Sequence, residues 1–232
     1  MDLEAILESR PVTHPNEQGE QAPFQLDPAL LRLIDRRVDE GSRTLETGAG
    51  LSTLLFAAKG CPHTCVVPFH SEIERIRAWC EEAGVSLNGV TFHQRLSEEV
   101  LPTLEPEPLD LVLIDGGHGF PTPFIDWHYA GRRLKIGGTL IVDDIHLWTG
   151  RVLTDFLTES GRWRTVERVP MRAAAFERLS ADDPLEDWVA QPYVARRSYV
   201  GGPRGLVRRG VKAAHLARQR RLTELARRAL HR

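Results

Sequence analysis

Residues 44–53 read TLETGAGLST, a short apolar strand pattern that runs through two glycines directly into a helical pattern. Glycine lacks a Cβ, so Gly48 and Gly50 allow a sharp backbone turn and a ligand in contact with the backbone. The first N–H groups of the following helix are then directed at that ligand. A dinucleotide fingerprint requires glycine where Thr53 stands, and a P-loop requires Gly-Lys-Ser or Gly-Lys-Thr, so both match poorly. A ligand-binding turn and a plain strand-to-helix turn both remain open.

Outward from this turn, short apolar runs alternate with helical patterns. The runs predict strands at Thr44–Glu46, Thr64–Pro68, Val90–His93, Leu109–Asp115 and Thr139–Asp143. Helices are predicted at residues 51–59, 71–83, 98–104, 123–134 and 149–159, and an antiparallel strand pair at 163–169 and 173–179. Right-handed crossovers build such a chain into an open, doubly wound α/β sheet of Rossmann-like type, with ligands at the carboxyl ends of the strands.

The composition is that of an ordinary globular protein, with 232 residues, 41% hydrophobic and 27% charged. The longest apolar runs are strand-sized, far below the ~20 residues of a membrane span, so no transmembrane segment is expected. Residues 1–11 lack the basic and apolar regions of a secretory signal, which predicts a cytoplasmic protein. Three cysteines fit neither a disulfide framework nor a four-ligand zinc site, and we expect them to be reduced and buried.

Charge is distributed unevenly along the chain. Residues 193–232 contain twelve Lys or Arg and one acid, a charge of +11, which leaves −13 for residues 1–192. This basic end predicts a helix that contacts an acidic surface of its own chain or of a partner, an anionic membrane surface, or nucleic acid. The expected organisation is an N-terminal arm at 1–26, an α/β domain at 27–183, a linker at 184–203 and a basic helix at 204–232.

Two further stretches extend the pattern of the first turn, LVLIDGGH at 111–118 and LKIGGTLIVDD at 134–144. With the acid two residues before Gly48, they resemble class I S-adenosylmethionine-dependent methyltransferases of the branch that modifies small molecules. The resemblance covers about residues 43–179 and implies strand order 3-2-1-4-5-7-6 with the last strand antiparallel. It implies that the cofactor lies above strands 1 and 2 and that Glu46 lies near its methionine part. The implied cofactor-binding residues are Glu46, Thr47, Gly48, Ala49, Gly50, Ser52, His70 and Asp115.

The end of the second strand departs from this family. The family usually has an acid there that accepts both ribose hydroxyls, and the corresponding position is held by His70 or Phe69. A neutral histidine can accept only one such bond. Glu72 is one substitute, although an acid in the first turn of a helix is also favoured by the helix dipole.

Three carboxylates follow neighbouring strands: Asp115 after the fourth, and Asp143 and Asp144 after the fifth. Like charges in one cleft either raise a pKa or hold a cation, and oxygen ligands suit Mg²⁺ or Ca²⁺ better than zinc. The arrangement is similar to the divalent-metal site of catechol-type and antibiotic-tailoring O-methyltransferases. The other interpretation is that these acids cap the helices that follow.

His118 is a candidate base, because its reference pKa of ~6.5 suits proton transfer near neutrality, and His146 is a second one. A hydrogen bond from His118 to a loop carbonyl is the alternative. Together these features predict an S-adenosylmethionine-dependent O-methyltransferase of a small-molecule substrate, with His118 and Asp115 catalytic and Mg²⁺ assistance left open. The alternative is a methyltransferase-like, non-catalytic binding or scaffold protein. Homo-oligomerisation is also left open.

Overall fold

The computed structural model describes residues 1–9, 11–19, 26–181, 186–198, 200 and 202–230. Parts of the predicted arm, linker and basic helix, at 20–25, 184–185 and 231–232, therefore lie outside the described residues. The chain divides into two compact units, residues 1–183 and 184–232. Each unit is described by itself.

The first unit is built on one seven-stranded sheet of order β3-β2-β1-β4-β5-β7-β6. Strands β1 to β5 are parallel, and β7 runs antiparallel to both β5 and β6. This confirms the Rossmann-like α/β fold and the strand order that the resemblance implies. The strands are β1 Thr44–Thr47, β2 His63–Val66, β3 Val90–His93, β4 Leu109–Ile114, β5 Leu134–Val142, β6 Trp163–Val169 and β7 Ala173–Arg178.

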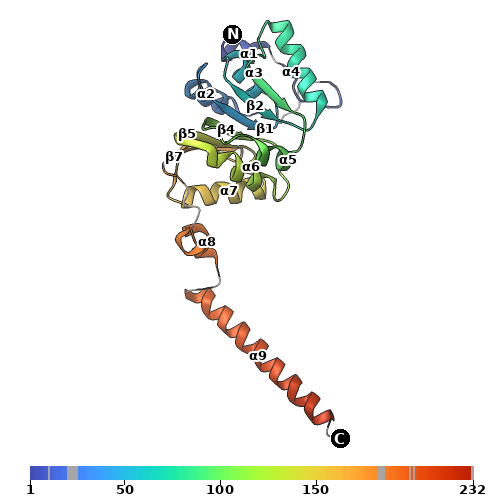
Figure 1. Cartoon of the computed structure of the whole chain (residues 1–232), viewed down its shortest axis with the longest axis vertical. Helices are drawn as coiled ribbons and strands as arrows, with labels where there is room; N and C mark the ends of the chain where they lie inside the picture. Colours follow the sequence, from blue (N-terminus) through green and yellow to red (C-terminus); the bar gives the residue numbers. More distant parts are fainter. Residues whose placement is uncertain (10, 20–25, 182–185, 199, 201, 231–232) are drawn as a thin grey trace. The chain divides into compact units, whose positions relative to one another are not determined.

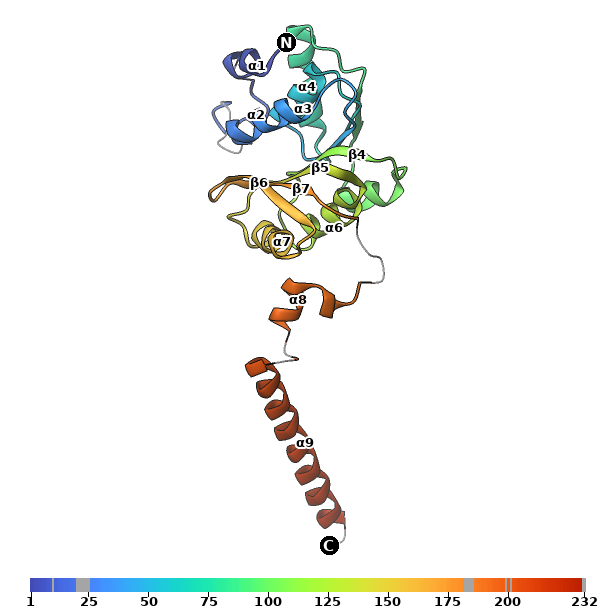
Figure 2. The ribbon, with the colours of Figure 1, turned by 90° about the vertical axis from the view of Figure 1, so that its left-hand side faces the viewer.

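Helices cover both faces of the sheet (Figures 1 and 2). One layer contains α1 Leu3–Ser9, α2 Pro28–Arg37, α3 Leu51–Ala58 and α4 His70–Ala83. The other contains α5 Ser97–Val100, α6 Thr122–Tyr129 and α7 Trp148–Glu159, with the 3₁₀ turns η1 Leu101–Thr103 and η2 Gly131–Arg133. The sheet is therefore the middle of three layers, as a near-continuous apolar strand such as β4 requires.

The two faces of β4 show how one strand supplies both cores. Side chains alternate along a strand, so Leu111 and Leu113 pack in the cluster with α1 to α4, while Val112 and Ile114 pack in the cluster with α6 and α7. All four are buried. The three cysteines are buried free thiols, as expected, and burial raises the pKa of Cys61 and Cys80 to about 11.

Strand β5 is longer than its predicted range of 139–143. It begins at Leu134, directly after η2, so the predicted helix at 123–134 ends earlier, at Tyr129. Two glycines lie inside the strand, and one of them, Gly137, has φ +85°. Gly137 lies between Leu134 and Thr139, the residues of β5 between which the pairing with β4 shifts. Glycine permits this conformation at little steric cost, which explains why the strand continues through the Gly-Gly pair.

The second unit contains more helix than the predicted linker. Within residues 184–203 lie the 3₁₀ turn η3 Trp188–Ala190 and the helix α8 Pro192–Arg197, and the basic helix α9 spans Gly202–Leu230. From residue 206 to 221 the side chains of α9 are exposed. Among the described residues, none of the helices combines the length and the apolar character that a bilayer crossing requires.

Candidate active site

A cavity of about 830 Å³ lies at the carboxyl ends of the parallel strands. It is lined by residues 47–49 at the end of β1 and after it, 66–69 at the end of β2 and after it, 96–98 before and in α5, and 115–118 after β4. The loop after β5 adds Asp144, His146 and Leu147, the β6–β7 turn adds Arg172, and the N-terminal arm adds His14. An open parallel sheet places ligand sites at this edge, so the cavity lies where the strand pattern predicts it.

The loop after β1 approaches the loop after β4 very closely. Gly48 has φ +89°, and a Cβ built on it would lie 2.2 Å from the carbonyl oxygen of Asp115. A Cβ on Gly50 would instead lie 3.4 Å from Nε2 of His14. Gly48 lines the cavity, but the space left by its missing Cβ is taken up by the Asp115 backbone. This glycine is therefore required by the packing of two loops, whereas the sequence analysis explained it by room for a ligand.

Glu46 lies beneath the loop after β1 and is 1% exposed. Its carboxylate accepts hydrogen bonds from the hydroxyls of Ser52, at 2.6 Å, and Thr53. Nε2 of His63 lies 3.0 Å from the same carboxylate and so donates to it, which leaves Nδ1 to accept from the Thr44 hydroxyl at 2.8 Å. Glu46 and Ser52 thus tie the first turn of α3 to β1 and β2, and they are outside the lining of the cavity, as is Gly50.

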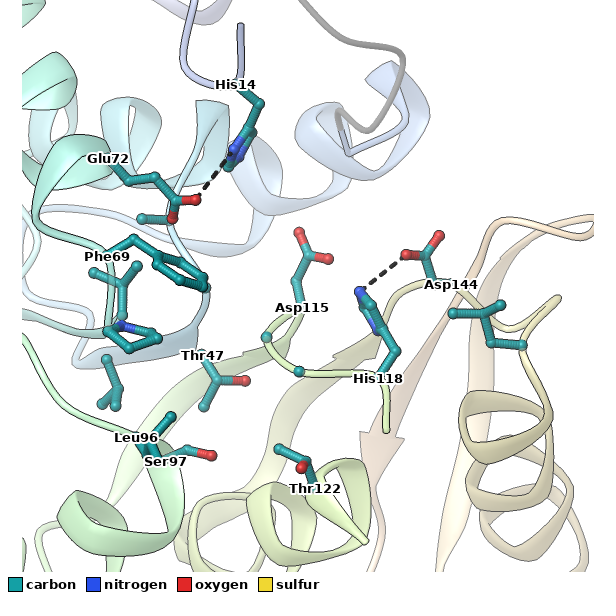
Figure 3. Close-up of a pocket in the computed structure, with 18 of the residues that line it drawn as sticks. His14, Thr47, Phe69, Glu72, Leu96, Ser97, Asp115, His118, Thr122 and Asp144 are labelled. Carbon is teal, nitrogen blue, oxygen red and sulfur yellow. Dashed lines mark ion pairs between the residues drawn. The ribbon is translucent and has the colours of Figure 1, made fainter. Parts of the chain in front are cut away.

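The end of β2 presents Phe69 and Glu72 to the cavity. His70 is exposed, and its Nδ1 contacts Oε1 of Gln94 at 3.2 Å, so it is outside the lining. The Glu72 carboxylate lies 3.6 Å from Nδ1 of His14, and Figure 3 shows the two side chains facing each other at the edge of the cavity. The acid on this side is therefore in the first turn of α4, and of the two roles considered for Glu72 its position favours the one in the site.

His14 lines the cavity, but nothing in the sequence around it indicates a site. It belongs to an arm with no hydrophobic period, and its place depends on contacts with distant residues. Nε of Arg75 donates to the carbonyl of Thr13 at 2.8 Å, and Thr13 is buried. A helix of the first unit thus holds the arm against the turn at Gly50, and no local pattern could have predicted this contact.

Asp115, His118 and Asp144 form a cluster on the other side of the cavity (Figure 3). One potential ligand atom from each lies within 4.8 Å of the others, and Nε2 of His118 lies 3.1 Å from Oδ2 of Asp144. Asp143 is outside this cluster and is 4% exposed. Asp143 is also outside the lining of the cavity, whereas the next residue, Asp144, which has φ +50°, is part of it. Of the residues predicted to bind a metal, Asp115 and Asp144 therefore lie together in this cluster, and His118 takes the place predicted for Asp143.

Several acidic side chains lie near one another here, and the repulsion between their negative charges is unfavourable. Burial, and then the carboxylates of Asp143, Asp144 and Glu46, raise the pKa of Asp115 well above its ordinary value, while Arg172 lowers it. Burial likewise raises the pKa of Asp143 to about 6. A bound cation reverses such shifts because it stabilises the ionised carboxylates. The site therefore suits a divalent ion or the positively charged part of a ligand.

Comparisons with known proteins agree with this architecture. The sequence model of a family described as "Methyltransferase domain" matches residues 45–145. A comparison with curated proteins finds no match.

Several solved structures share the fold. A Staphylococcus aureus protein assigned provisionally as a caffeoyl-CoA O-methyltransferase has a TM-score of 0.60 and 15% identity, over 77% of this chain and 92% of that one. The O-methyltransferase TomG of Streptomyces achromogenes, involved in tomaymycin synthesis and solved with S-adenosylmethionine, has a TM-score of 0.58 and 20% identity, over 75% and 90%. An rRNA methylase from Streptococcus thermophilus has a TM-score of 0.52 and 13% identity, over 66% and 95%. At these identities the likeness concerns the fold: residues 45–145 match the model of a methyltransferase domain, and the first unit has the fold of the class I S-adenosylmethionine-dependent methyltransferases.

Proposed function

We propose that this protein is an S-adenosylmethionine-dependent methyltransferase that acts on a hydroxyl group of a small molecule. The observation that carries the proposal is that one cavity joins the glycine turn after β1 to the acidic cluster after β4 and β5. The first is where the family resemblance expects the cofactor, and the second offers groups that can hold and deprotonate an acceptor. The O-methyltransferase TomG, solved with S-adenosylmethionine, has the same fold and supports the choice of cofactor.

The lining of the cavity fits the parts of this cofactor. Val66, Val67 and Leu96 supply apolar surface for a flat base, and Glu72 supplies a carboxylate for ribose hydroxyls. Acidic residues around Asp115 suit the positively charged methionine part. Of the residues predicted from the sequence, Thr47, Gly48, Ala49 and Asp115 would contact the cofactor. The others, Glu46, Gly50, Ser52 and His70, would act by shaping its surroundings.

His118 is the proposed base. Its Nε2 lies against Asp144, so a neutral imidazole that donates there keeps Nδ1 as the nitrogen that can accept a proton. Asp144 then holds one tautomer and stabilises the imidazolium that forms, which is how a carboxylate assists a catalytic histidine. The chain otherwise contributes by positioning the acceptor hydroxyl.

Asp115, His118 and Asp144 also fit a divalent cation, because two carboxylates and an imidazole converge, each with one potential ligand atom within 4.8 Å of the others. When bound, such an ion supplies positive charge that lowers the pKa of a substrate hydroxyl. His118 is then a ligand, and the neighbouring base is His146, whose Nδ1 lies 3.5 Å from Oδ1 of Asp144. Dependence on Mg²⁺ separates these two forms of the proposal.

Calorimetric titration with S-adenosylhomocysteine tests the cofactor. We expect binding in the micromolar range and a loss of about tenfold in Glu72→Gln, the value of one hydrogen bond to a charged group. Glu74→Gln is the matched control, since Glu74 is on the same helix, is exposed, and pairs with Arg77 outside the cavity. An absence of binding at millimolar ligand would overturn the proposed function.

A further inference from the structure

The helix α9 of the second unit has a dense and exposed positive charge that the proposed function does not use. Residues 206–221 are exposed and contain six Lys or Arg and no acid. The six are Arg208, Arg209, Lys212, Arg218, Arg220 and Arg221. Figure 2 shows α9 as one uninterrupted helix. At 1.5 Å per residue, the stretch from 208 to 221 is about 21 Å long and has one positive charge per ~3.5 Å.

These charges surround the helix axis. At about 100° per residue, no sector wider than about 100° lacks one of the six basic side chains. The large apolar residues of the stretch, Leu206, Val207, Val211 and Leu216, are spread over about 220° of the circumference, with basic side chains between them. Arg218, for example, is only about 20° from Val211. Residues 206–221 therefore offer no continuous apolar face with which to enter a bilayer or to pack against a second helix.

The basic side chains also repel one another within the helix. Lys212 follows Arg208 by four residues and Arg209 by three. Arg221 likewise follows Arg218 by three. Like charges at these spacings are neighbours on the helix surface and destabilise it, and residues 206–221 contain no acid that could offset the repulsion. An anionic partner would remove this repulsion, so the helix should become more stable when the partner binds.

The distribution of charge indicates the shape of that partner. A flat acidic surface contacts one side of a helix and leaves the basic residues on the other side without a partner. The major groove of B-form DNA instead is about 12 Å wide, admits an α-helix, and has a phosphate strand along each border. Each strand has one phosphate per ~3.4 Å of its length, which is close to the charge spacing along α9. The major groove of A-form RNA is too narrow and deep for such a helix.

We propose that α9 binds duplex DNA by lying in the major groove, with its basic side chains at the phosphates of both strands. The contacts are to phosphates, so binding depends on charge and groove shape and carries little sequence preference. This inference concerns the second unit alone and is independent of the proposed function of the first.

Fluorescence anisotropy tests the proposal on the full chain, with a labelled 20-base-pair DNA duplex and an RNA duplex of the same sequence as probes. Six phosphate contacts predict a slope of log K against log [NaCl] of about −5, and a loss of affinity of about 10³-fold between 50 and 200 mM NaCl. The RNA duplex should bind at least ~5-fold more weakly. Circular dichroism should show a gain in helix when DNA is added.

A triple variant removes half of the contacts. In Arg218→Gln/Arg220→Gln/Arg221→Gln the slope should fall to about −3, because each lost phosphate contact removes about 0.9 from it. The matched control is Arg36→Gln/Arg151→Gln/Arg168→Gln, which removes the same charge from three exposed positions of the first unit. This control should keep the slope of the unmodified protein. Thermal melting checks that both variants are folded.

Three results would overturn the inference. Equal losses in the two triple variants would show that only net charge matters. An RNA duplex that binds as tightly as the DNA duplex would exclude the groove as the binding site. Binding to vesicles with 30% phosphatidylserine, without binding to DNA, would identify a membrane surface as the partner. In each case S-adenosylhomocysteine binding, measured separately, would still decide the proposed function of the first unit.

Discussion

Gly48→Ala is the substitution for which the structure predicts the largest local effect. The new Cβ would lie 2.2 Å from the Asp115 carbonyl oxygen, so one of the two loops must move, and such overpacking costs about 1–3 kcal/mol. The φ of +89° adds about 1–2 kcal/mol for a residue with a side chain. Alanine also restricts the unfolded chain more than glycine does, and this effect stabilises the folded state by about 0.4–1 kcal/mol. We expect a net loss of about 2–4 kcal/mol in the free energy of unfolding.

Gly137→Ala separates the two contributions. Gly137 has nearly the same φ, +85°, but nothing lies within 4 Å of the position its Cβ would take. This variant should lose at most about 1 kcal/mol, so the difference between the two measures the contact with Asp115. Urea denaturation provides both values from the shift in midpoint at constant slope. If the two variants agree within about 0.5 kcal/mol, the close approach of the two loops is refuted.

Four further predictions concern charge and catalysis. The pKa of Asp143 is raised to about 6 in the folded state, so the stability it contributes is present below pH ~4 and is lost as pH rises through 6. Asp143→Asn should therefore raise the free energy of unfolding, measured by urea denaturation, by about 1–2 kcal/mol over the unmodified protein at pH 7.5 and leave it unchanged at pH 4. His118→Asn should lower methyl transfer by about 10²–10⁴-fold while S-adenosylhomocysteine binding changes less than about 3-fold. In the metal-assisted form EDTA should abolish transfer and Mg²⁺ should restore it, and transfer that is insensitive to EDTA would refute that form and leave His118 as the base. Removal of residues 204–232 should lower the salt concentration of elution from heparin, and an unchanged elution would show that the basic helix does not bind polyanions.

The layered α/β architecture could be predicted from local patterns in the sequence. A buried strand and an amphipathic helix each have a pattern that repeats every few residues, so the strands at 90–93 and 109–114 and the helix at 71–83 were predicted to within a residue or so. Strand order came from the family resemblance, which rests on the short stretches at 44–53, 111–118 and 134–144. These stretches are contiguous in the chain and need no tertiary information to find.

Which polar side chains line the cavity together depends on the packing of segments that are distant in the sequence. A strand pattern cannot tell which of Asp143 and Asp144 lines the cavity, and in the structure it is Asp144. His14 reaches the site through its contact with Glu72, which is more than fifty positions away in the sequence. Hydrophobic burial is a sum over many side chains and shows in local patterns, whereas a binding site depends on the direction of a few side chains, which is set by packing between distant segments.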